Sequence, residues 1–274
     1  MTSILTNNGA MVALQTLKTI NNNLENTQNA ISTGKEIATA KDNSAIWAIS
    51  KVMESDVSGF NAVSDSLALG ESTVAVALAG AEQITDLLKE MKEKVVAATG
   101  ENVDNAKLDA DVTELKNQIT SIISASQFNG ANLLNSEGGD MTVLSSLDRD
   151  SAGDISSSNI TVASVNFESN LDLTQVRVST SALADASISE IELLIQTAVD
   201  GAAALGASAK RIEKQSDFVS KVTDAMKSGI GSLVDTDMEE ASARLKALQT
   251  QQQLGVQALS IANSAPQTLQ QLFR

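Results

Sequence analysis

The stretch VDTDMEEASARLKALQTQQQLGVQALSIANSAPQTLQQLF, residues 234–273, decides the fold. Taken at alternating steps of four and three, its residues are mostly apolar, and this heptad pattern predicts a helix packed on a partner helix. The pattern consists of Val234, Met238, Ala241, Leu245, Leu248, Gln252, Gly255, Leu259, Ala262, Pro266, Leu269 and Phe273. A second apolar line, formed by Ala247, Leu254 and Ile261, indicates further neighbours. No charged residue lies between Lys246 and Arg274, so we expect this helix to be buried against other copies of the chain.

The N-terminal stretch carries a matching pattern. Its apolar line runs through Ala10, Ala13, Leu17, Ile20, Leu24, Thr27 and Ile31. Residues 1–33 contain only Lys18 and Glu25 as charged residues. A single helix of this kind is marginally stable, because nucleation is costly and one face stays exposed. We therefore expect the two end helices to pair as a two-helix coiled coil whose outer faces remain to be covered.

Composition excludes several classes of function. The formal net charge of −15 argues against nucleic acid as a partner. The chain has no Cys and no His, which removes thiolate nucleophiles, Cys/His zinc sites and the imidazole base. No calcium-loop spacing, membrane-spanning stretch or ordinary signal peptide is visible. We therefore expect no catalytic residue, no cofactor, no metal and no membrane insertion.

The first half of the chain predicts a short linker and two helices. Residues 32–41 form a polar break that contains Gly34, and Asp42 is expected to cap the helix that follows. A three-four apolar pattern predicts one long helix over 42–99. After a turn at 100–104, a shorter helix is expected to fold back antiparallel and to end near Ser126.

The middle of the chain has a different texture. Residues 128–130 (Phe-Asn-Gly) signal a turn, and 135–180 are rich in Ser, Asp, Asn and Gly. Residues 160–162 and 176–178 are predicted as short strands. Because this segment carries many carboxylates, we expect it to lie on the surface.

Helical periodicity resumes near Ala184 and continues to Leu233, with a second linker expected near Gly229, Gly231 and Asp235. The predicted fold is mainly α, a long antiparallel helical hairpin or coiled-coil bundle with a small β-hairpin insertion in mid-chain. We expect an inner terminal-helix domain (1–41 with 234–274), a helical rod domain (42–134 with 183–233) and a surface-exposed variable segment (135–182).

Several motifs in this arrangement resemble those of bacterial flagellin. In their details they are similar to the alphaproteobacterial type of the family. Residues 32–35 (STGK) with 40–42 (AKD) resemble the family's linker motif, and 128–134 (FNGANLL) resemble the motif that opens its β-hairpin. Residues 235–237 (DTD) with Glu240 are similar to its acidic motif. The C-terminal signature is carried by Gln252, Gln253, Gly255, Leu259, Ala262, Asn263, Pro266, Gln267, Leu269 and Leu272. Glu36 and Asn43 depart from the linker pattern, where Arg and Asp are usual.

The resemblance implies a secreted subunit that polymerises into the extracellular flagellar filament for swimming motility. It implies type III export and, as partners, other copies of the chain, an export chaperone, a filament cap and hook-junction proteins. The expected self-assembly seam consists of Leu17, Ile20, Leu24, Ile31, Leu245, Leu248, Leu254, Leu259, Ala262, Leu269 and Phe273. The resemblance also places Glu90, Glu93 and Lys94 where many flagellins contact an innate immune receptor, with Glu90 in place of Arg and Lys94 in place of Leu.

Two other functions are compatible with the pattern. The first is the hook–filament junction protein, a homologue with similar end helices that ends a filament instead of building it. The second is a coiled-coil signalling or chaperone module, which is expected to carry charges beside its terminal seams. Residues 247–273 are uncharged, which counts against this second alternative.

Overall fold

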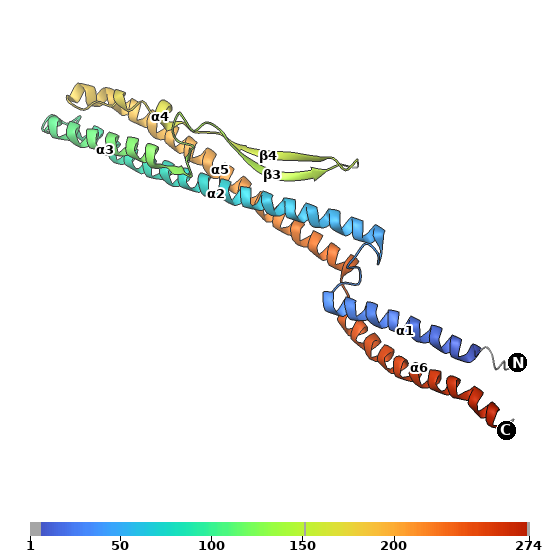
Figure 1. Ribbon diagram of the computed structural model, residues 1–274. Coiled ribbons are helices and arrows are strands. Elements are labelled where there is room, and N and C mark those ends of the chain that lie inside the picture. The colour runs from blue at the N-terminus through green and yellow to red at the C-terminus, as the bar shows by residue number, and fades with distance from the viewer. Residues whose placement is uncertain (1–6, 151, 273–274) are drawn as a thin grey trace. The chain divides into compact units, whose positions relative to one another are not determined.

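The computed structural model describes residues 7–150 and 152–272, with side chains up to residue 264. The chain is mainly α-helical, as the sequence predicts (Figure 1). In order, the elements are α1 (Asn8–Thr33), α2 (Ser44–Ala97), α3 (Asn105–Ala125), β1 (Gln127–Phe128), β2 (Ala131–Asn132), β3 (Met141–Arg149), β4 (Ile155–Val162), α4 (Phe167–Asn170), η1 (Leu173–Gln175), α5 (Ser181–Val234) and α6 (Met238–Leu272).

The chain forms two compact units. Residues 1–55 with 225–274 form the end unit, and residues 56–224 form the core unit. Both divisions fall within the long helices α2 and α5, beyond the linkers that the sequence indicates. The three-part domain division expected from the sequence stays a prediction.

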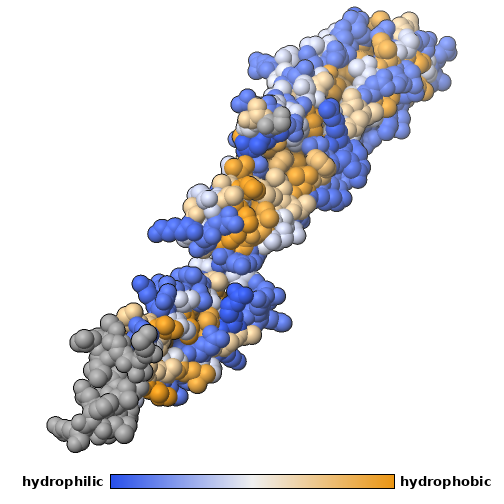
Figure 2. All heavy atoms as spheres, turned by 90° about the vertical axis from the view of Figure 1, so that its right-hand side faces the viewer, coloured by the Kyte–Doolittle hydropathy of each residue, from blue (hydrophilic) through white to orange (hydrophobic). Residues whose placement is uncertain are grey.

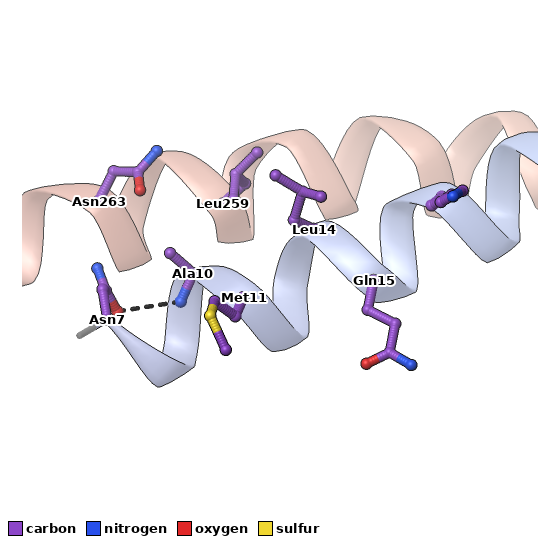
Figure 3. Close-up of a pocket in the computed structure, with 8 residues that line it drawn as sticks. Asn7, Ala10, Met11, Leu14, Gln15, Leu259 and Asn263 are labelled. Atoms are coloured by element: carbon purple, nitrogen blue, oxygen red, sulfur yellow. Dashed lines mark hydrogen bonds between the residues drawn. The ribbon is translucent and has the colours of Figure 1, made fainter.

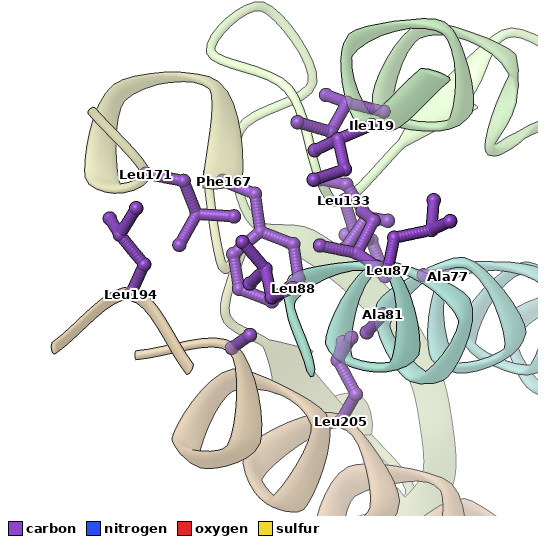
Figure 4. Packing of buried hydrophobic residues seen from close by; sticks show 14 of the residues in the cluster. Ala77, Ala81, Leu87, Leu88, Ile119, Leu133, Phe167, Leu171, Leu194 and Leu205 are labelled. Carbon is purple, nitrogen blue, oxygen red and sulfur yellow. The ribbon is translucent and has the colours of Figure 1, made fainter. Parts of the chain in front are cut away.

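The core unit is held together by apolar stripes on α2, α3 and α5. On α2 the predicted three-four pattern is buried from Val63 to Val95, and on α5 it is buried at Ile191, Leu205 and Ile212. Figure 4 shows Phe167, Leu88, Leu133, Ile119 and Leu205 gathered in this core. Burying a large apolar side chain contributes about 1.5–3 kcal/mol, so burial of this cluster stabilises the unit.

The strands pair in two hairpins. Strands β1 and β2 flank the turn at 128–130, where Asn129 and Gly130 both have positive φ, as the Asn-Gly signal predicts. Strands β3 and β4 are antiparallel, with a register shift near Ser145. The sequence prediction covered only the end of β4 and missed β3.

The β3–β4 hairpin packs on the long helices. Val143 and Leu147 lie against Gly70 and Gly59 of α2, and Arg149 forms an ion pair with Asp56. Val143, Ile160 and Val162 are buried in the core, and so are Phe167 and Leu171 farther along the chain. The prediction that 135–182 is exposed on the surface is therefore wrong for these apolar side chains, although it holds for the carboxylates of the segment.

The strand predicted at Val176–Val178 does not form. Although Val176 and Val178 are fully buried, this segment pairs with no strand in the described parts of the chain. Side chains satisfy its backbone instead: Lys116 donates to the Val176 carbonyl, Asp109 accepts from the Val178 N–H, and Ser187 hydrogen bonds with both backbone groups of Arg177. Here the apolar residues alternate because their side chains are buried, and the alternation does not indicate a paired strand.

Helix boundaries differ from the prediction in two places. Asn43 caps α2, because its Oδ1 accepts from the N–H groups of Ala45 and Ile46, whereas Asp42 accepts from Thr39. Helix α5 continues through Gly229 and Gly231 to Val234, so the second linker is confined to residues 235–237.

Helix α2 also corrects the expectation about membrane-spanning stretches. It contains an 18-residue window of mean hydropathy 1.2, long and apolar enough by composition to cross a bilayer. A third of this window is buried inside the molecule. A core helix meets the same criterion, so the window alone does not indicate a span.

Candidate functional site

Helices α1 and α6 lie side by side in the end unit and bring the two predicted apolar lines together (Figure 1). On α1, Leu17, Ile20, Leu24 and Ile31 are half-buried and Thr27 is buried. On α6, Leu248 is buried, and Leu245, Leu259 and Ala262 are half-buried. Leu254 is exposed, the side chain of Leu269 lies outside the described residues, and so does Phe273 as a whole.

Polar contacts fix the register of α1 against α6. The Asn7 side chain caps α1 by accepting from the Ala10 N–H and donates to the Ala262 carbonyl at 2.7 Å. Farther along, Gln252 donates to Asn21 at 2.8 Å. These two cross-helix contacts were not predicted. The sequence signal for them is weak, because it consists only of an Asn before the first helix and of polar residues beside an apolar line.

Gly255 lets the two helices approach closely. A Cβ placed on it would lie 3.1 Å from Leu17 Cδ1, closer than most side chains tolerate. Near this point an open groove of about 510 Å³ lies on the pair. Figure 3 shows Ala10, Met11 and Leu14 of α1 and Leu259 of α6 lining it.

The pair leaves further apolar side chains exposed. On α6, Leu254 is 58% exposed and Ile261 is 70% exposed, and Val256 is exposed beside them. On α1 the exposed apolar residues are Met11, Val12 and Leu14. Figure 2 shows orange, hydrophobic residues at the surface of the end unit. The intramolecular seam therefore uses one face of each helix and leaves a second face open.

The two linkers of the end unit contact each other. Lys35 and Asp235 form an antiparallel bridge, the Glu36 N–H donates to the Val234 carbonyl, and the Thr236 N–H donates to the Gly34 carbonyl. Gly34 has a φ of 70°, a conformation that favours glycine. Asp237 then starts α6 by accepting from the N–H groups of Glu239 and Glu240.

An ionic contact ties the first linker to α2. The Glu54 carboxylate accepts from Lys51 and from Lys35, and these contacts, with Lys51 the larger, hold its pKa below the ordinary value. Lys35 belongs to the linker, whereas Lys51 and Glu54 lie on α2. The pairs are partly exposed, so each contributes about 0–1 kcal/mol and positions the linker more than it stabilises the fold.

Charge is distributed unequally between the units. The end unit has eight basic and eight acidic residues, and the core unit has 11 basic and 26 acidic residues. The whole formal charge of −15 therefore belongs to the core unit. A neutral, apolar end unit can pack on further copies without accumulating like charge.

The three residues predicted at an immune-receptor contact lie on α2 of the core unit. Glu90 and Glu93 are exposed. Lys94 is ion-paired with Asp111 of α3 at 3.0 Å, and this hydrogen bond and charge raise the pKa of the lysine. The pair was not predicted, because sequence patterns do not show which exposed residues of α2 and α3 meet.

Within the described parts of the chain, no group of three or more carboxylates could hold a metal ion. The features that distinguish this protein are surfaces, namely the apolar faces of the end unit and the acidic core unit.

Comparison with known proteins identifies the family of this chain. Residues 4–138 match the bacterial flagellin N-terminal helical region, and residues 188–273 match the bacterial flagellin C-terminal helical region. A crystal structure of Bacillus cereus flagellin is also similar, with a TM-score of 0.49 and 22% identity over 55% of this chain and 86% of the other, which is too weak to add to the assignment.

Curated relatives match over their full length. Flagellin FljO of Caulobacter vibrioides is 41% identical over 100% of this chain and 99% of its own. A flagellin of Brucella melitensis is 40% identical, and flagellin C of Rhizobium meliloti is 37% identical, each over 100% of both chains. The chain therefore belongs to the bacterial flagellin family and is a structural subunit of the flagellar filament.

Proposed function

We propose that the end unit is the part of this flagellin through which copies join into the filament. The observation that carries the proposal is the second apolar face of the α1–α6 pair, with Leu254 and Ile261 exposed on a helix that has no charge between residues 247 and 264. A neutral unit with uncovered apolar faces gains stability when further copies cover them. Contacts that do not close on themselves then give an open helical polymer.

We assign two roles to the apolar residues of the end unit. Leu17, Leu248 and Leu259 are buried or half-buried on the paired helices, and we assign them to the seam that holds the pair together. Leu254 and Ile261 point away from that seam, and we assign them to contacts between copies. Leu269 and Phe273 stay proposed members of the assembly seam on the sequence pattern alone.

Seeded polymerisation followed by electron microscopy tests this division. We expect Leu254→Asp to abolish filament growth while the monomer keeps its helical content, because burying an unpaired carboxylate in each contact costs several kcal/mol. Gln253→Asp adds the same charge at an exposed position of α6 outside both apolar lines, and should polymerise. Normal growth of Leu254→Asp filaments would contradict the proposal.

Leu259→Asp tests the other role, which is to hold α1 and α6 together within one chain. Leu259 lines the groove against α1, so we expect this variant to lose helical content in the monomer as well as filament growth. The change is readable by circular dichroism before any seeding. If the monomer keeps its full helical content, Leu259 does not hold the pair.

We also propose that the chain is exported through the flagellar type III apparatus to the extracellular filament. An export chaperone, a filament cap and hook-junction proteins would be its partners. Family membership supports this proposal. Secretion of the chain by cells with and without the flagellar export apparatus tests it, and equal amounts in both media would contradict it.

A further inference from the structure

A basic stripe crosses the acidic core unit on α5. Arg211, Lys214, Phe218 and Lys221 follow one another at steps of three, four and three, which places them on one face of the helix. All four are exposed, and Phe218 is 56% exposed. In the sequence this stripe is interrupted by the acidic residues Glu213 and Asp217, so it does not stand out as a run of basic residues.

These cations lack the ion pairs that their own helix offers. Asp217 lies three residues after Lys214, and Asp224 lies three residues after Lys221, yet among the described residues neither lysine forms an ion pair and neither does Arg211. Lys210, one residue from the stripe, does pair with Glu213 at 2.8 Å. The stripe is therefore available to an external partner.

Charge and apolar exposure together indicate what that partner is. An exposed Phe between three cations suits a surface that covers an apolar ring and supplies carboxylates around it. The core unit carries the whole charge of −15, so the surfaces that a second copy presents are predominantly acidic. In a filament, copies are the neighbours present at every contact.

We propose that this stripe docks on an acidic surface of the core unit of a second copy. The inference rests on the proposed polymerisation of the chain. Besides the contacts between end units, the stripe would form an electrostatic contact that orients neighbouring core units. Complementary charge sets register and suppresses wrong arrangements between copies that otherwise repel each other.

The critical concentration for seeded growth tests the contact. Lys214→Glu should raise it about tenfold at low salt, and the difference from wild type should shrink at high salt. Lys107→Glu is the control for charge, because it makes the same change of charge at an exposed position of the core unit away from the stripe. It also removes the exposed pair of Lys107 with Asp104, which contributes little to stability. Phe218→Ala should also raise the critical concentration without changing charge. Equal values for Lys214→Glu and Lys107→Glu would overturn the inference.

A zero-length cross-linker identifies the partner directly. Filaments grown from a mixture of unlabelled and ¹⁵N-labelled chains are treated with a carbodiimide, which joins a lysine amine to a carboxylate. We expect Lys214 and Lys221 to link to core-unit carboxylates of a differently labelled chain. Links confined to Asp217, Asp224 or other residues of the same chain would overturn the inference. Failure of the wild-type chain to polymerise at all would instead contradict the proposed function.

Discussion

Single glycines determine how closely the central segment can approach the long helices. At Gly201 of α5, an added Cβ would lie 2.4 Å from Val165 Cγ1 and 2.7 Å from the Phe167 ring. Phe167 is fully buried, so it cannot move aside without disturbing the core. At Gly206, five residues along the same helix, an added Cβ would meet nothing within 4 Å.

This contrast predicts opposite effects of one substitution. Gly201→Ala should lower the free energy of unfolding of the monomer by about 1–3 kcal/mol, because it overpacks a filled core. Gly206→Ala should raise it by about 0.5–1 kcal/mol, because alanine favours the helix more than glycine does. Chemical denaturation of the two variants beside wild type measures both. A stabilised Gly201→Ala variant would show that Val165 and Phe167 do not pack on α5.

The first linker contains a carboxylate whose protonation matters. The Thr39 backbone N–H and hydroxyl both donate to Asp42, and they hold the pKa of this carboxyl below its ordinary value of 3.8. The group binds a proton less readily in the folded chain than in the unfolded chain. Its stabilising contribution is therefore present above the unfolded pKa and is lost as the pH falls through the folded one.

We expect an NMR titration of the monomer to give Asp42 a pKa below 3.8, and Thr39→Val, which removes the hydroxyl donor, to raise it. A titration of Asp42 at or above 3.8 would contradict the linker geometry.

The resemblance to other flagellins makes one residue-scale prediction about immune recognition. We propose that Glu90 and Lys94 stand where many flagellins present an Arg and a Leu to an innate immune receptor, so that an attraction would become a repulsion and an apolar contact would become a hydrated cation. We expect weak receptor activation by this protein and a stronger response from Glu90→Arg with Lys94→Leu. The substitution of Lys94 also removes its ion pair with Asp111, and solvent-screened pairs of this kind contribute little to stability.

A reporter-cell assay on endotoxin-free monomer measures this response. Glu82→Arg, at another exposed position of α2, controls for a general gain of positive charge. A full-strength response from the unmodified protein would refute the prediction.

At the scale of elements, the sequence predicted the helices well and the strands poorly. The apolar lines of α1 and α6 repeat over many turns, and most of their described side chains are buried or half-buried where the two helices pack together. Strand β3 was missed because Thr, Ser and Leu alternate only weakly in it, and its burial depends on Gly70 in a distant helix. The Val176–Val178 segment shows the converse, because Asp109, Lys116 and Ser187 replace the strand partner that its pattern suggested.

The buried side chains of the β3–β4 hairpin make it a structural element, not a dispensable loop. We expect deletion of 141–162 to lower the melting temperature of the monomer by several degrees, because Val143, Ile160 and Val162 leave the core and Asp56 loses Arg149. Shortening only the connection between β3 and β4 should change the melting temperature little. An unchanged melting temperature after the large deletion would show that the hairpin does not stabilise the core unit.

At the scale of the whole molecule, the two units differ in what stabilises them. The core unit has a continuous buried cluster, whereas among the described side chains of α1 and α6 only Thr27, Ala241 and Leu248 are buried. The apolar and charge patterns of the sequence already indicated that the two ends of the chain differ from its middle in this way. The individual contacts that fix it, such as Asn7 with Ala262 and Lys94 with Asp111, depend on tertiary geometry and could not be predicted from the sequence.

Hydrogen exchange of monomer and filament tests whether neighbouring copies complete the end unit. In the monomer, amides of α1 and α6 should exchange faster than those in the buried stretches of α2 and α5, because few apolar contacts resist local opening. In the filament, amides of α1 and α6 should slow by roughly tenfold or more, well beyond any change in the core unit. Exchange of α1 and α6 at the same rate in monomer and filament would contradict the account.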